Sequence, residues 1–280
     1  MAEWSITTAL ASGSGSSGGK DFRMTIGLIT ENELHGWIVG HEREAQGLTA
    51  DLVYQLVDLS AKEKKEFRFP KSDSIGQHGK DGKLETEDGY LPYVPCGNSL
   101  WELGSGDNPQ QKANDDYVKR RDALDERERL ETTFVFVTPR SAAHNWSLPA
   151  QEKWLAEKRD ENAWKDVRVI DGTKLVQWVA AFPAVDAWLA KRLGRPTNGF
   201  ERADDYWSDL RSVGNPPPLS PEIFTANRES ACAKLKEVLD NLTNQLQIDT
   251  HSRSQATDFV AAYIATLPGE QRQSIVGSCL

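Results

Sequence analysis

The sequence predicts a mixed α/β domain in which helices cover both faces of one sheet. A helical pattern comes first, at residues 30–62, and three short strand patterns follow close together, at residues 67–70, 80–85 and 99–104. Helical and strand patterns then alternate, as expected when helices lie on both faces of a sheet. The expected order is therefore helix, three strands, helix, strand, helix, strand, helix.

The first helical pattern begins with a capping box formed by Thr30 and Glu33. Apolar residues then recur at intervals of three and four residues, which is the spacing of one buried helix face. Asp51 lies within the second part of this stripe, and an acid there is a supporting candidate for a metal site. The apolar residues are Leu34, Trp37, Ile38, Leu48, Leu52, Leu56 and Leu59.

The segments with strand patterns at residues 80–85 and 99–104 each carry an acid. Alternation places Leu100 and Glu102 on one face and Trp101 on the other, so a carboxylate interrupts an apolar face. If Asp81 lies on the neighbouring strand, two carboxylates about 4 Å apart repel by roughly 4 kcal/mol at an effective dielectric constant near 20. A hard cation reverses that sign, and Mg²⁺ accepts one or two carboxylates together with waters and phosphate oxygens. Mn²⁺ is the alternative ion.

The later elements follow from apolar periodicity and end signals. We expect a charged helix at residues 110–130. Lys112 lies in its first turn, and Arg120 is one of its solvated charges. A strand that is apolar on both faces follows, as expected at the centre of a covered sheet. The expected elements beyond it are a strand at 133–138, a helix at 149–159, a strand at 167–170 and helices at 173–181 and 183–194.

Composition shifts divide the chain into four parts. Residues 11–20 are rich in glycine and serine, so we expect residues 1–27 to be a flexible N-terminal segment. The main domain then spans 28–195. A proline run marks a linker at 196–220, and residues 221–280 are the start of a second, mainly helical domain that is incomplete.

The composition points to a protein of the cytoplasm without a disulfide framework. The three cysteines are odd in number and widely separated, which argues against disulfides and against a zinc site. No apolar run reaches the roughly 20 residues of a membrane span. The net charge of −9 lacks the basic excess usual in nucleic-acid-binding domains, but a bound cation inverts the local field of an acidic site.

The order of strand acid, strand acid and lysine resembles the PD-(D/E)XK superfamily of restriction-endonuclease-like nucleases, with Asp81 and Glu102 as the two acids. That superfamily places its lysine two residues after the second acid, where this chain has Gly104. The resemblance therefore implies that Lys112 reaches in from the following helix. Lys119 is the fallback, although we expect it to pair with Asp115 or Asp116.

A closer resemblance is to the N-terminal nuclease of bacterial antiviral STAND NTPases, and it covers about residues 28–194. It implies a Mg²⁺-dependent endonuclease acting on double-stranded DNA, which an NTPase and sensor in the same polypeptide restrain and assemble into a homo-oligomer. The motifs that carry it are Glu44-Ala45-Gln46, Asp51-Leu52-Val53, Asp81-Gly82, Val94-Pro95, Trp101-Glu102-Leu103-Gly104, Lys112-Ala113-Asn114, Asp116-Tyr117, Lys119-Arg120, residues 134–140 and residues 164–168.

Two alternatives stay open. Because Gly104 replaces the usual lysine, the chain is alternatively a catalytically inactive nuclease fold used for oligomerisation or for binding a partner or nucleic acid. The other alternative is cleavage of RNA, or of one DNA strand, by the same metal chemistry, since phosphodiester hydrolysis uses the same groups on each substrate.

Overall fold

The computed structural model of the chain forms two compact units. The larger unit is Thr25–Thr197, and the other joins Met1–Met24 to Asn198–Leu280. The candidate residues from the sequence all belong to the larger unit. The structure describes residues 5–9, 27–69, 81–197, 199, 201–212, 219–241, 245–250 and 252–278.

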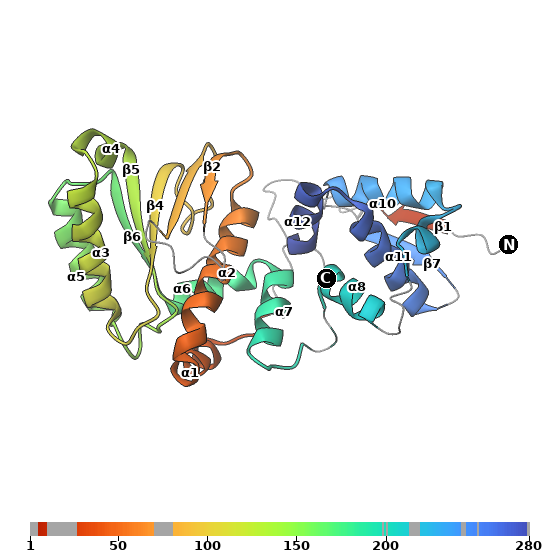
Figure 1. The fold of residues 1–280 in the computed structure, drawn as a ribbon, viewed down its shortest axis with the longest axis horizontal. Helices are drawn as coiled ribbons and strands as arrows, with labels where there is room; N and C mark the ends of the chain where they lie inside the picture. Colours follow the sequence, from red (N-terminus) through yellow and green to blue (C-terminus); the bar gives the residue numbers. More distant parts are fainter. Residues whose placement is uncertain are drawn as a thin grey trace, which may run out of the picture. The chain divides into compact units, whose positions relative to one another are not determined.

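A five-stranded sheet forms the centre of the larger unit (Figure 1). Its strands lie side by side in chain order, and the first three pair antiparallel while the last three pair parallel. The mixed sheet predicted from the sequence is confirmed. The strands are β2 (Lys64–Arg68), β3 (Gly82–Thr86), β4 (Gly97–Leu103), β5 (Thr132–Val137) and β6 (Asp166–Ile170).

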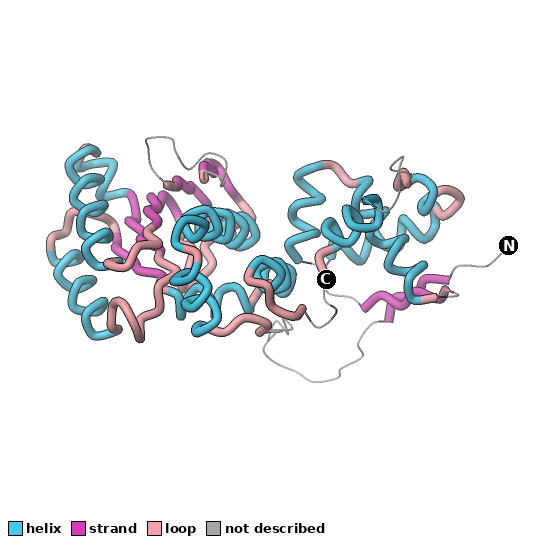
Figure 2. Tube along the Cα trace, turned by 60° about the horizontal axis from the view of Figure 1, so that its bottom comes forward, coloured by secondary structure: helices cyan, strands magenta, loops and turns pink. Residues whose placement is uncertain are grey.

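Helices cover both faces of this sheet (Figure 2). One face, which includes Trp101 and Val135, packs against α1 (Glu31–Gly40), α2 (Glu42–Ser60), α6 (Gly172–Ala180) and α7 (Pro183–Arg192). The other face, which includes Leu100 and Phe134, packs against α3 (Pro109–Ala123) and α5 (Leu148–Asp160). Because side chains alternate along a strand, Glu102 shares the face of Leu100 and lies under α3.

Two helical segments are shorter than the sequence predicts. The segment at 30–62 is two helices, because α1 ends at Gly40, a poor helix former, and α2 begins after His41. The capping box of Thr30 and Glu33 is confirmed at the start of α1. The charged helix expected at 110–130 also divides, because the Asp125 side chain caps a separate helix, α4 (Glu126–Glu131).

The smaller unit contains a two-stranded sheet and several helices. Its strand β1 (Ser5–Ala9) pairs antiparallel with β7 (Gln245–Asp249). The expectation of a flexible segment is therefore wrong for residues 5–9, where β-branched side chains favour a strand. The remaining elements are α8 (Ala203–Ser212), α9 (Glu222–Thr225), α10 (Glu229–Asn241), α11 (Arg253–Thr266) and α12 (Gly269–Ser278).

The span expected as a linker, 196–220, contains the helix α8, so it is not a spacer throughout. The buried Trp207 anchors α8 on Ala261 and Ala262 of α11. The proline run at 216–218 and the residues at 10–26 lie outside the described residues. Among the residues that are described, no helix has both the length and the apolar character that crossing a membrane requires.

Candidate functional site

Two acidic side chains meet where β3 begins and β4 ends. The antiparallel register pairs Gly82 with Trp101, so Asp81, one residue earlier, lies beside Glu102. The Asp81 Oδ2 atom accepts a hydrogen bond from the backbone N–H of Leu103 at 2.9 Å. The sequence-based prediction that these acids lie next to each other across neighbouring strand segments is confirmed.

Glu102 is buried and forms an ion pair with an arginine of α3. Only 2% of Glu102 and 8% of Arg120 are exposed. The Nε–H group of Arg120 donates a hydrogen bond to Glu102 Oε1. The balanced charges along this helix predict a solvated Arg120, and that prediction is wrong, because the carboxylate beneath α3 draws the guanidinium into the packed face.

Asp116 and Lys112 form a second ion pair on the same face of α3. The Lys112 ammonium donates to Asp116 Oδ1 at 2.7 Å. The Asp116 residue is only 4% exposed, and its Oδ2 atom has no hydrogen-bond partner among the described residues. Since Lys112, Asp116 and Arg120 are each four positions apart, they form one row along the helix. This spacing of four is the pattern in the sequence that could have placed Asp116 and Arg120 on the helix face of Lys112.

The stem of Lys112 lies where a side chain on Gly104 would begin. A Cβ atom on Gly104 would stand 2.9 Å from Lys112 Cγ and 2.8 Å from Phe136 Cζ. The lysine of α3 therefore occupies the space beside Gly104, the position just after β4 at which the nucleases that the sequence resembles carry a lysine. Within the described part of the chain, the Lys112 ammonium bonds to Asp116 and not directly to Asp81 or Glu102.

The ionised forms of Glu102 and Asp116 are both disfavoured in the fold. Burial above all, with the charges of Asp81 and Asp116, raises the pKa of Glu102 to about 7, against the opposing effect of the Arg120 pair. Burial is also the main cause that raises the pKa of Asp116, and the charge of Asp81 adds to it. The charge of Asp81 thus acts on both buried carboxylates, and a divalent cation would relieve this repulsion.

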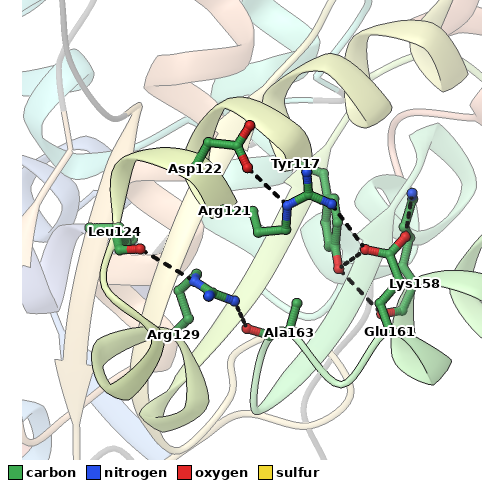
Figure 3. Close-up of polar contacts among 8 residues, drawn as sticks. All are labelled: Tyr117, Arg121, Asp122, Leu124, Arg129, Lys158, Glu161 and Ala163. Atoms are coloured by element: carbon green, nitrogen blue, oxygen red, sulfur yellow. Dashed lines mark hydrogen bonds and ion pairs between the residues drawn. The ribbon is translucent and has the colours of Figure 1, made fainter.

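The position of α3 is fixed by a polar network around Tyr117 (Figure 3). The Tyr117 hydroxyl donates to the Glu161 carboxylate at 3.0 Å. Lys158 and Arg121 pair with the same carboxylate, at 2.8 and 3.5 Å. The ring of Tyr117 meets Phe134 of the sheet edge-on. Because this network fixes the rotation of α3 about its axis, it determines which side chains face Glu102.

Two supporting candidates from the sequence lie apart from these acids. Asp51 belongs to α2, which packs on the face of Trp101, so it lies on the opposite side of the sheet from Glu102. Lys119 is exposed on α3 and forms no ion pair within the described ranges. Its expected pairing with Asp115 or Asp116 is therefore not formed. Asp115 instead accepts from the Gln111 side chain, and Asp116 accepts from Lys112.

The chemistry of these residues suits a hard divalent cation. Among the described residues, no group of three or more histidine, cysteine, aspartate or glutamate side chains could hold a metal ion. Mg²⁺ needs fewer, because it keeps several waters and is bound through one or two carboxylates and the substrate phosphate. Asp81 and Glu102 supply two carboxylates, and Asp116 Oδ2 is a buried acceptor with no partner among the described residues.

Comparison with known proteins gave no match: no protein-family model, no curated protein and no solved structure matches the chain.

Proposed function

We propose that the unit Thr25–Thr197 is a Mg²⁺-dependent DNA endonuclease. The observation that carries the proposal is the meeting of Asp81 and Glu102 at the ends of neighbouring strands, with the stem of Lys112 beside Gly104. Two carboxylates that share a cation, together with a lysine, are the groups that metal-assisted hydrolysis of a phosphodiester requires.

Each side chain has a role in this proposal. Asp81 and Glu102 would hold the ion, which supplies Lewis acidity and lowers the pKa of a bound water. The Lys112 side chain is 48% exposed, so its ammonium is open to a phosphate. There it would stabilise the negative charge that develops in the transition state. Arg120 holds Glu102 in place under α3. Mn²⁺ would serve as a substitute ion with the same oxygen ligands.

The family resemblance in the sequence supports a setting for this activity. In that setting the nuclease acts in antiphage defence in the cytoplasm and cuts double-stranded DNA. An NTPase and sensor region of the same or a longer polypeptide would control it, and the active form would be a homo-oligomer. Assembly would control cleavage because it brings together two active units, one for each strand of the DNA.

The experiment is cleavage of supercoiled plasmid DNA by the full chain, with Mg²⁺ or with EDTA. We expect cutting by the wild type with Mg²⁺, and loss of cutting in Asp81→Asn and in Glu102→Gln. Glu85→Gln is the matched control, because Glu85 lies on β3 on the same face but opposite Asn98, away from Glu102. Cutting by Glu102→Gln at the wild-type rate would contradict the proposal. A single-stranded RNA substrate in parallel tests the alternative substrate.

A second candidate function is an inactive nuclease fold that binds a partner or nucleic acid. One observation favours it: Glu102 is already paired with Arg120, and Lys112 with Asp116, so these four charged side chains have internal partners. This alternative predicts DNA binding or self-association that is the same in wild type and in Glu102→Gln, with no cutting in either Mg²⁺ or Mn²⁺.

A further inference from the structure

Asp116 has a buried oxygen that the pairing with Lys112 leaves unsatisfied. Its Oδ1 atom accepts from the Lys112 ammonium, while Oδ2 has no partner among the described residues although the side chain is only 6% exposed. A buried carboxylate oxygen is normally hydrogen-bonded, so an unsatisfied one requires an explanation. The ion pair with Lys112 does not explain it, because ion pairs on a helix surface leave both charges in water, whereas this oxygen is buried.

The neighbours of Asp116 on α3 show over which part of the sheet this residue lies. Four residues before it, Lys112 lies against Gly104 at the end of β4. Four residues after it, Arg120 reaches Glu102 on the same strand. Asp116 therefore lies midway along the row on α3, over the part of β4 that carries Glu102. Its charge acts on Glu102, and that of Asp81 acts on Asp116, so the oxygen belongs to the same group of acids.

A cation-bound water is the partner that fits this oxygen. Mg²⁺ keeps part of its water shell when it is bound by one or two carboxylates. Such waters donate hydrogen bonds, and carboxylates just outside the ligand set commonly accept them. An indirect role also agrees with the absence, in the described part of the chain, of three acids arranged to bind an ion directly.

We propose that Asp116 is the third carboxylate of the cation site, and that its Oδ2 atom holds a water bound to the ion that Asp81 and Glu102 bind. The inference rests on the proposed function, because it takes the same cation as given. Asp116 is then a positioning residue with two partners, the ammonium of Lys112 through one oxygen and the water through the other. Asp116 then has the supporting role at the metal site for which Asp51 is the candidate from the sequence.

The test is Mn²⁺ binding to the full chain without DNA, measured by electron paramagnetic resonance of the free ion. Asp116→Asn keeps the shape but replaces one acceptor oxygen by a donor group. We expect its Mn²⁺ affinity to fall about 10- to 100-fold, the usual effect of losing such an outer partner. Asp115→Asn is the matched control, because Asp115 is the exposed neighbour and its side chain accepts from Gln111, with no ion pair in the described part of the chain. Its affinity should equal that of the wild type.

Glu102→Gln separates the failure of this inference from the failure of the proposed function. If Glu102→Gln weakens Mn²⁺ binding and Asp116→Asn does not, Asp116 serves only to hold Lys112 and the inference is wrong. If the wild type binds no Mn²⁺, the cation site itself is wrong and both proposals fall. Circular dichroism confirms that each variant folds. If Asp116→Asn does not fold, Asp116→Glu, which keeps the charge and displaces the oxygen, should also weaken binding, and wild-type affinity would overturn the inference.

Discussion

The Cγ atom of Lys112 lies 2.9 Å from the position that a Cβ atom on Gly104 would take. The two residues therefore share one space, and only a glycine on the strand leaves room for the lysine of the helix. The ring of Phe136 closes the same space from the other side. The glycine at position 104 and the position of the Lys112 stem are thus a single structural feature.

Gly104→Ala should destabilise the fold through this shared space. A methyl group there would overlap Phe136 and Lys112, and overpacking of a core site typically costs about 1–3 kcal/mol. In a chain that already carries Lys112→Ala, the loss should be smaller, because one of the two obstacles is gone. Urea unfolding of the four chains gives the coupling energy. If the losses of stability in the two single variants simply add in the double variant, the two residues do not share one space.

Glu102→Ala should destabilise the fold by more than Asp81→Ala. From the sequence alone, removal of either acid relieves a like-charge repulsion and leaves folding intact or slightly improved. The buried pair with Arg120 reverses this for Glu102, because loss of one partner of a buried ion pair costs about 3–5 kcal/mol. Adding Arg120→Met to Glu102→Ala should recover most of the loss. Chemical unfolding measures all four chains, and equal losses in the two single variants would contradict this role of the pair.

Relative to Glu102→Gln, the wild type should lose stability between about pH 4.5 and pH 7. The pKa of Glu102 is about 7 in the fold, against an ordinary value of 4.5, so the folded state holds a proton that the unfolded chain has released in this interval. The free energy of unfolding therefore decreases as the pH rises, by at most on the order of 3 kcal/mol from this group. In Glu102→Gln the decrease should be smaller by this contribution.

This comparison uses the difference between wild type and Glu102→Gln, because the pKa values of Asp116 and Asp186 are raised by burial as well. Urea unfolding at pH 5 and pH 8 measures it. A wild type that gains stability from pH 5 to pH 8 relative to Glu102→Gln would show that the Arg120 pair, and not burial, controls Glu102.

The local pattern of the sequence predicts the sheet and the two acids well. Alternation at Leu100, Trp101 and Glu102 determines which residues face each helix layer, and the short strands next to each other form an antiparallel meander. Alternation along a strand and short loops between strands are properties of neighbouring residues, so a single sequence is enough to predict them. The position of Asp81 beside Glu102 follows from that register alone.

The burial of charges depends on contacts between distant residues, and the sequence does not predict it. Arg120 lies in a run of balanced charges that resembles a solvated helix, yet it is buried because Tyr117 and Glu161 fix the rotation of α3. Similarly, β1 has its only described strand partner in β7, more than two hundred residues along the chain. Asp51 has helical periodicity like that of its neighbours, and only the sheet order shows that its helix covers the other face.

Lys112→Ala should lower the cleavage rate far more than Lys119→Ala. The Lys112 stem lies beside Gly104 and its ammonium bonds to Asp116, whereas Lys119 is exposed and forms no ion pair in the described part of the chain. Removal of one electrostatic contact to the transition state typically lowers the rate on the order of 10²-fold or more. Lys119→Ala should change the cleavage rate only slightly, because substitutions at exposed surface positions usually have small effects.

The same pair of variants distinguishes a catalytic lysine from a lysine that only balances charge. A cation that contacts the phosphate stabilises the transition state more than it holds the metal, so Lys112→Ala should retain Mn²⁺ affinity while its single-turnover rate on plasmid DNA falls. Lys112→Arg keeps the charge and should recover part of the rate. A large loss in Lys119→Ala with little loss in Lys112→Ala would move the role to Lys119. Equal, small losses in both would show that cleavage needs neither lysine, and the role given to Lys112 would then be wrong.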